Sequence, residues 1–140
     1  MTNAFRMTIG ALPGEVARAN AAFEEFAEAH ALPAAVRRSM HVALDELLKN
    51  TIEYGFTGRN GGELTVAVEL GTDRVTLTLT DDGAPFDPFA VADPDTSLAV
   101  DARRIGGLGI YLVRKMMDEV SYERRADRNI VVLEKHLGVG

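Results

Sequence analysis

The chain has no cysteine and no tryptophan in its 140 residues, and its three histidines, His30, His41 and His136, lie far apart in the sequence. The lack of cysteine excludes disulfides, thiolate metal sites and cysteine nucleophiles, and it suits a reducing compartment. Three scattered histidines argue against a zinc site built from histidine. We therefore set aside enzyme classes that depend on a reactive thiol or on such a zinc ion.

Long apolar runs and basic clusters are missing as well. No stretch approaches the roughly 18 apolar residues of a membrane span, and no apolar segment of signal length follows residues 1–6. Fifteen lysines and arginines against 21 aspartates and glutamates give a net charge of −6, and the longest arginine runs are pairs at 37–38, 103–104 and 124–125. So acidic a chain is poorly suited to tracking a nucleic-acid backbone. We expect a cytoplasmic protein that contacts neither nucleic acid nor a membrane.

The composition, 46% hydrophobic and 26% charged, is that of a globular chain, and we expect one domain over residues 1–140. Apolar periodicity predicts alternating short elements with hairpin pairing, which favours an α+β fold: a two-layer α/β sandwich with helices on one face of a mixed, mostly antiparallel sheet. Residues 81–105 lack periodicity, as is typical of a functional or mobile segment. The predicted elements are a strand at 5–9, helices at about 13–30 and from 33 to 55 or 58, strands at 63–70 and 74–80, a helix at 107–118, and strands at 120–125 and 129–136.

The first motif lies at residues 45–50 (DELLKN) of the second predicted helix. Glu46 and Asn50 are four residues apart, so they share one face of the helix, and Glu53 continues it. An asparagine oxygen suits Mg²⁺, and a carboxylate one turn away could accept a proton from a nucleophile held against a γ-phosphate. Taken alone, the pattern is more typical of a solvated polar face.

Two further motifs lie at the ends of the aperiodic segment. Residues 80–88 (TDDGAPFDP) follow a strand, where a carboxylate can accept a hydrogen bond from an exocyclic amine and Gly83 allows a flat ring to approach. Residues 103–110 (RRIGGLGI) open a helix, where glycine amides can contact phosphate. Singly, these patterns are more typical of an acidic turn and a flexible hinge. The second is neither a P-loop nor a dinucleotide fingerprint.

Together, the order, spacing and placement of the three motifs resemble the N, G1 and G2 boxes of the GHKL (Bergerat-fold) ATPases, and the resemblance extends over nearly the whole chain. Within that superfamily, residues 46–56, 81–88, 106–113 and 117–120 look like those of the anti-sigma-factor serine/threonine kinases of the RsbW and SpoIIAB type. The Pro-Phe-Asp-Pro ending at residues 85–88 is the most specific piece. The resemblance implies a Bergerat fold that uses ATP and Mg²⁺.

The resemblance also implies a role for individual residues. Glu46 would be the general base, and Asn50 would hold the Mg²⁺ that bridges the phosphates. Asp81 would receive the adenine amino group with Gly83 beneath the ring. Tyr54 would stand at a position of nucleotide contact where many members have histidine. Phosphates would be held by Gly106, Gly107, Leu108 and Gly109, with an ATP lid at about residues 89–105 from which Arg104 could reach the terminal phosphate.

The final predicted strand departs from the family pattern. Many members carry there a Gly-Thr pair that supports the adenine end of the nucleotide. Residues 128–130 of this chain read RNI, so Asn129 stands in that region without the hydroxyl.

Relatives of this type work by partner switching: the kinase holds a sigma factor, or instead binds and phosphorylates a STAS-domain antagonist. The resemblance implies both partners and a homodimer formed through the sheet side. Glu15 and Arg18 on the first predicted helix are candidates for partner contact, although exposed helical charges are more often simply solvated. The retained Glu46 favours catalysis.

Two other interpretations are weighed against the kinase. A nucleotide-dependent anti-sigma binding module with little or no kinase activity would carry the same binding motifs. A sensor histidine kinase fragment would need a helical hairpin that bears the accepting histidine, and a gyrase- or mismatch-repair-type ATPase would need a transducer domain with a catalytic lysine. We expect neither of these within the 140 residues.

Overall fold

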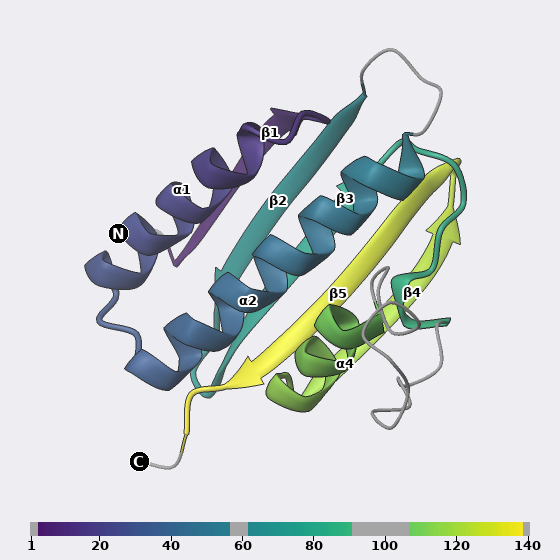
Figure 1. Ribbon diagram of the computed structural model, residues 1–140. Helices are drawn as coiled ribbons and strands as arrows, with labels where there is room; N and C mark the ends of the chain where they lie inside the picture. Colours follow the sequence, from purple (N-terminus) through teal and green to yellow (C-terminus); the bar gives the residue numbers. More distant parts are fainter. Residues whose placement is uncertain (1–2, 57–61, 91–106, 139–140) are drawn as a thin grey trace.

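The computed structural model describes residues 3–56, 62–90 and 107–138, and it arranges them in two layers (Figure 1). One layer is a five-stranded sheet in the order β1-β2-β3-β5-β4, in which all four pairings are antiparallel. The other consists of helices on a single face of that sheet. The strands are β1 (Ala4–Gly10), β2 (Glu63–Leu70), β3 (Arg74–Asp81), β4 (Glu119–Arg125) and β5 (Arg128–His136), and the α-helices are α1 (Glu15–Ala29), α2 (Ala34–Asn50) and α4 (Gly107–Met116).

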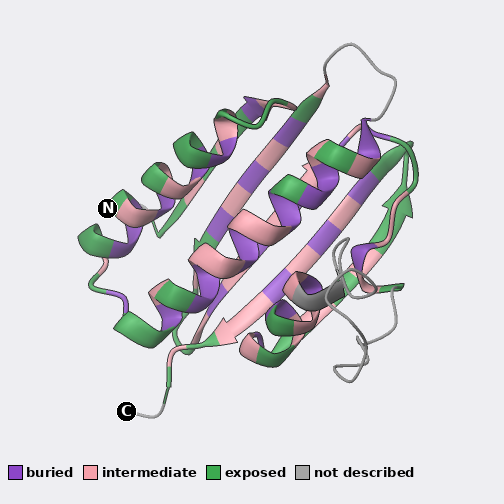
Figure 2. Cartoon of the chain, viewed as in Figure 1, coloured by how far each residue is buried: buried purple, intermediate pink, exposed green. Residues whose placement is uncertain are grey.

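The strands show the two-residue alternation that the sequence predicts. In β2 and β3, every second side chain is buried, and the paired residues Val66 and Leu79, like Val68 and Leu77, face the helices together. Figure 2 shows the same alternation along β2 and β5. Because successive side chains of a strand point to opposite faces, the other set, including Thr65, faces away from the helices.

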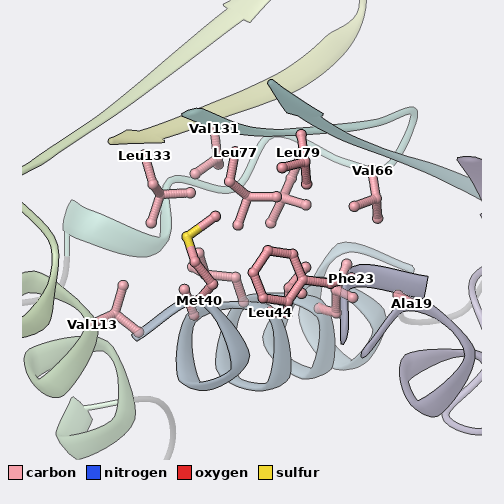
Figure 3. Packing of buried hydrophobic residues seen from close by; sticks show 14 of the residues in the cluster. Ala19, Phe23, Met40, Leu44, Val66, Leu77, Leu79, Val113, Val131 and Leu133 are labelled. Atoms are coloured by element: carbon pink, nitrogen blue, oxygen red, sulfur yellow. The ribbon is translucent and has the colours of Figure 1, made fainter. Parts of the chain in front are cut away.

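The core lies between α2 and the middle of the sheet. α2 crosses the centre of the sheet, with α1 beside it over β1 and α4 over β5 and β4 (Figure 1). Phe23 of α1 and Met40 and Leu44 of α2 point toward Leu77 and Leu133 (Figure 3), and all five side chains are buried. Burial of each such side chain contributes roughly 1.5–3 kcal/mol, so this layer of contacts fixes α2 against the sheet.

The α+β two-layer fold predicted from periodicity is confirmed, and all predicted elements are found within a few residues of their expected bounds. The sequence left room for a mixed sheet, but every pairing among the described strands is antiparallel. The second predicted helix also differs from the expected continuous α-helix. The α-helix α2 ends at Asn50, and a π-helical turn, η1 (Thr51–Gly55), follows it directly. Such turns occur often at functional sites.

The aperiodic segment begins where β3 ends, at Asp81, and contains a short 3-10 helix, η2 (Pro88–Ala90). Residues 91–105, which make up most of the predicted lid, lie outside the described residues. No helix in the described part of the chain is long and apolar enough to cross a membrane.

Candidate functional site

The first side of the candidate site is the C-terminal end of α2, which carries Glu46 and Asn50 one turn apart. Asn50 is only 7% exposed, and its side-chain amide makes no hydrogen bond with any residue that the structure describes. A buried amide without a partner is costly, and most such groups are satisfied by protein, water or ligand. Asn50 therefore has the character of a ligand-binding group.

Glu46 brings α2 into contact with the start of α4. A side chain placed at Gly109 would overlap the Glu46 carboxylate, so the carboxylate occupies the space that this glycine leaves open. Gly107 and Leu108 form the first turn of α4. A helix N-terminus has free N–H groups and positive potential, which favour anions. The first and third motifs are far apart in the sequence, and the contact between Glu46 and Gly109 brings them together.

The second side of the site is Asp81 at the end of β3. This aspartate is 6% exposed, and its Oδ1 atom accepts hydrogen bonds from the Gly83 N–H and from Asn129 Nδ2, both at 2.9 Å. Its Oδ2 atom accepts none from the described residues. Burial raises the pKa of Asp81, and the two donors act against that rise. Asp81 thus keeps one oxygen with unused hydrogen-bonding capacity among the described residues.

A backbone contact joins the turn after Asp81 to the η1 turn that follows α2. The Ala84 N–H donates to the Gly55 carbonyl at 3.0 Å, and a Cβ atom at Gly83 would lie 2.7 Å from that same oxygen. Only glycine allows this approach. Nearby, the Tyr54 and Phe86 rings lie 5.9 Å apart between centroids. The second motif therefore packs against the η1 turn that directly follows the first motif.

Three residues of the site were not assigned by motif. Asn129 of β5 donates to Asp81, Tyr122 of β4 donates to Asn129 Oδ1 at 2.6 Å, and Arg124 Nη1 donates to the Gly83 carbonyl at 2.8 Å. The sequence singled out Asn129 only as a departure from a family pattern. The signal that could have found all three is strand register, because Asn129 lies opposite both Asp81 and Arg124.

The structure describes six predicted site residues in two groups of contacts: Glu46 meets Gly109 where α2 packs on α4, and the turn that carries Asp81 and Gly83 meets the η1 turn that follows Asn50 and contains Tyr54. Two others, Gly107 and Leu108, are placed only as the backbone of the first helical turn of α4. Arg104 and Gly106 lie outside the described residues. Their predicted roles remain predictions. The six residues are Glu46, Asn50, Tyr54, Asp81, Gly83 and Gly109.

Comparison with known proteins shows which family this chain is similar to. A family model described as a histidine kinase-like ATPase domain matches residues 9–135. The serine/threonine-protein kinase BtrW of Bordetella bronchiseptica is 29% identical over 103 residues, which cover 74% of this chain and 72% of that protein. The serine-protein kinase RsbW of Bacillus pumilus is 32% identical over 91 residues, covering 60% and 56%.

A third relative is the serine-protein kinase RsbW of Listeria innocua, 29% identical over 90 residues that cover 58% of this chain and 54% of that protein. The chain thus spans little more than half the length of the RsbW relatives it matches. The superfamily and the RsbW likeness predicted from the three motifs are confirmed by these matches.

Proposed function

Since the chain belongs to the histidine kinase-like ATPase domain family, we propose that it is a protein serine/threonine kinase that binds Mg-ATP at the end of the sheet where Asp81 lies. The observation that carries this proposal is a pair of buried polar groups with unused hydrogen-bonding capacity. These are the Asn50 amide and the Asp81 Oδ2 atom, on two walls of one site. A nucleotide that reached both would satisfy them together.

The chemistry of each group fits one part of Mg-ATP. Asp81 Oδ2 is an acceptor for the adenine amino group, in a turn that Gly83 keeps narrow. Asn50 offers an oxygen to Mg²⁺, which commonly takes one or two protein ligands together with phosphates. When bound there, Mg²⁺ would neutralise negative charge on the phosphate oxygens. The first turn of α4 would hold the phosphates, with Gly106 and Arg104 contributing from the segment before it.

We propose Glu46 as the general base. Its carboxylate lies against Gly109 at the start of α4, next to the position proposed for the terminal phosphate. In the transfer step, the substrate hydroxyl oxygen forms a bond to the γ-phosphorus, the bond to the β–γ bridging oxygen breaks, and ADP leaves. The hydroxyl proton passes to Glu46. Most of the rate comes from positioning and charge neutralisation.

The names of the relatives support a kinase activity, and the motif resemblance is what suggests the partners. BtrW and RsbW are named as serine/threonine and serine-protein kinases, and the motif resemblance extends to partner switching. We propose that this chain sequesters a sigma factor in the cytoplasm and phosphorylates a STAS-domain antagonist. Glu15 and Arg18, joined at 2.8 Å on α1 with the Arg18 side chain 55% exposed, are proposed to contact a partner.

The proposed homodimer would use the face of the sheet that the helices leave uncovered (Figure 1). Residues of three strands line this face and are half-buried: Thr65 of β2, Thr76 and Thr78 of β3, and Ile130 and Val132 of β5. Burial of such a mixed surface against a second copy is common in homodimers. Sedimentation of the chain at micromolar concentration measures this state directly.

The proposal is tested by intact-mass spectrometry of candidate STAS-domain proteins incubated with this chain and Mg-ATP. We expect a gain of one phosphoryl group that is lost with Glu46→Gln and kept with Asp45→Asn. Asp45 is the matched control because it neighbours Glu46 but pairs with Lys49 at 3.0 Å on the exposed side. Failure with two antagonists, with ATP binding still seen by calorimetry, would favour the nucleotide-dependent binding module instead.

A further inference from the structure

Asn129 is a buried amide whose hydrogen bonds are all made within the protein. It is 2% exposed, and it lies on β5 directly opposite Asp81. Its Nδ2 group donates to Asp81 Oδ1 at 2.9 Å and to the Ala84 carbonyl at 2.8 Å. Its Oδ1 atom accepts from the Tyr122 hydroxyl at 2.6 Å and from the Phe86 N–H at 3.2 Å. Two donors and two acceptors are the full capacity of an asparagine amide.

This network allows the amide a single orientation. If the amide turned over, its NH₂ group would face the Phe86 N–H, and its oxygen would face the Asp81 carboxylate and the Ala84 carbonyl. Each of those pairings is repulsive. Asn129 therefore has no capacity left for a ligand, and it acts on any ligand only through the groups that it holds.

What Asn129 holds is the direction of the Asp81 carboxylate. Oδ1 is occupied by Asn129 and by the Gly83 N–H, so the carboxylate cannot rotate without losing two hydrogen bonds in a buried place. The remaining oxygen, Oδ2, is thereby fixed as the one that faces a ligand. The same amide, through Ala84 and Phe86, also fixes the turn beside it.

We propose that Asn129 is a positioning residue that sets base selectivity: it holds Asp81 as a pure acceptor, so that the site prefers a purine with a 6-amino group over one with a 6-oxo group. This inference rests on the proposed nucleotide-binding function and names its selectivity element. A 6-amino group donates to Oδ2, whereas a 6-oxo group presents an acceptor to an acceptor.

The charges and hydrogen bonds around Asp81 explain why the Asn129 amide matters for base selectivity. Burial raises the pKa of Asp81 and Asp82 adds to the rise, whereas the Asn129 and Gly83 donors and Arg124 oppose it. Without the Asn129 donor, the carboxyl group takes up a proton more readily and is held by only one of its two hydrogen bonds, that from the Gly83 N–H. A protonated carboxyl group can donate to a 6-oxo group, so the preference between the two purines should shrink.

The experiment is calorimetric titration of the unaltered chain and of Asn129→Ala with ATP and with inosine triphosphate, which carries 6-oxo in place of 6-amino. We expect the unaltered chain to favour ATP. In Asn129→Ala, ATP affinity should fall roughly ten- to hundredfold, while inosine triphosphate affinity changes much less. Equal weakening of both nucleotides, or no weakening of either, would overturn the proposal. If the unaltered chain binds neither nucleotide, the proposed function itself fails.

Two further variants test whether the loss of ATP affinity in Asn129→Ala comes from damaged packing alone. Tyr122→Phe removes a donor from the Oδ1 side of the amide but keeps the bond from Nδ2 to Asp81, so ATP affinity should fall less and the preference for ATP should remain. Asn129→Asp places two carboxyl groups face to face. Below the shared pKa of the pair, one proton bridges them and restores a donor to Asp81. ATP affinity of this variant should therefore rise as the pH falls relative to that of Asn129→Ala, and a pH profile parallel to that of Asn129→Ala would contradict the role.

Discussion

Two polar clusters of this molecule lie between packed elements, and they differ in what they leave unsatisfied. Between α1 and α2, His41 Nδ1 lies 2.7 Å from Asn20 Oδ1 and its Nε2 lies 2.5 Å from Glu24 Oε2. Arg37 donates to Glu24 at 3.0 Å and to two backbone carbonyls. Every ring nitrogen and guanidinium branch of this helix cluster has a partner inside the protein.

The cluster at the end of β3 is built on the same principle but is left incomplete. Asn129 is fully satisfied, yet the Asp81 Oδ2 atom beside it and the Asn50 amide have no partner among the described residues. In the helix cluster, polar groups bond to one another and join two helices. In the cluster at the end of β3, Asn129 orients Asp81 so that one carboxylate oxygen keeps unused hydrogen-bonding capacity. Burial alone does not distinguish the two; unused hydrogen-bonding capacity does.

The largest expected effect is on the rate of phosphoryl transfer, when Glu46 is replaced. This variant tests whether Glu46 serves the reaction rather than the binding of ATP. Glu46→Gln removes the proposed base but keeps the shape of the side chain, so phosphoryl transfer should slow by roughly 10²–10⁴. ATP affinity should stay within about twofold, since the base contributes to the transition state. Single-turnover transfer and calorimetric titration measure the two quantities. A parallel loss of ATP affinity would place Glu46 in nucleotide binding instead.

Asp81→Asn is expected to weaken ATP binding without destabilising the fold. The new amide keeps an oxygen for Gly83 and Asn129 but turns an NH₂ group toward the adenine amine, so ATP affinity should fall roughly ten- to hundredfold. The raised pKa of Asp81 means that its folded-state charge opposes folding above that pKa. The thermal midpoint at pH 7 should therefore hold or rise.

Calorimetric titration and differential scanning calorimetry test that pair of outcomes. Asp73→Asn is the matched control, because Asp73 precedes the other end of β3 and its side chain is 71% exposed. Unchanged ATP affinity in Asp81→Asn would contradict the adenine assignment. A large loss of stability would mean that the charge of Asp81 serves the fold, and the distinction between the two clusters would then fail.

His41→Leu should show the reverse pattern to Asp81→Asn. It removes both ring hydrogen bonds of the helix cluster and leaves Asn20 and Glu24 with fewer partners, so the thermal midpoint should fall by a few degrees. ATP affinity should not change, because His41 lies on the α1 side of α2 rather than at Asp81. Thermal unfolding with and without Mg-ATP measures both, and His136→Gln on exposed surface is the control. Lost ATP binding would show that the clusters are coupled.

The smallest effect concerns the pH dependence of the helix cluster. The hydrogen bond from His41, with Arg37 nearby, holds the pKa of Glu24 below its ordinary value of 4.5. A lowered carboxylate pKa stabilises the fold above the unfolded-state pKa, and this contribution is lost as pH falls through the folded-state pKa. Glu24→Gln should therefore lower the thermal midpoint at pH 7 and converge with the unaltered chain below about pH 4. If the two thermal midpoints differ by the same amount at neutral and at acidic pH, the charge of Glu24 does not stabilise the fold.

The fold could be predicted largely from local spacing. Helices repeat every 3.6 residues and strands every two, so the apolar patterns of α2, β2 and β3 carry their own assignment. The π-helical turn at Thr51–Gly55 could not be read in this way, because the sequence between Asn50 and Gly55 is also compatible with continued α-helix. Its geometry follows from the contact between the Gly55 carbonyl and the turn at Gly83 and Ala84.

The candidate site divides similarly. Glu46 and Asn50 could be paired from their spacing alone, and Asp81 and Gly83 from their place after a strand. Tyr122 and Arg124 carry no motif, and their contacts depend on register across the sheet. That register follows from the β4–β5 hairpin, whose two turn residues, Ala126 and Asp127, have φ of 53° and 61°.

By itself, the amino-acid sequence determined which elements form and which chemical groups each one carries, because periodicity and residue type are local properties of a chain. The tertiary structure alone decided which of those groups are used up and which stay available. Asn129 and Asp81 are 48 residues apart, and only the pairing of β3 with β5 makes them partners. That pairing occupies Oδ1 and leaves Oδ2 of Asp81 without a donor among the described residues, since hydrogen-bonding capacity is settled by neighbours in space rather than in sequence.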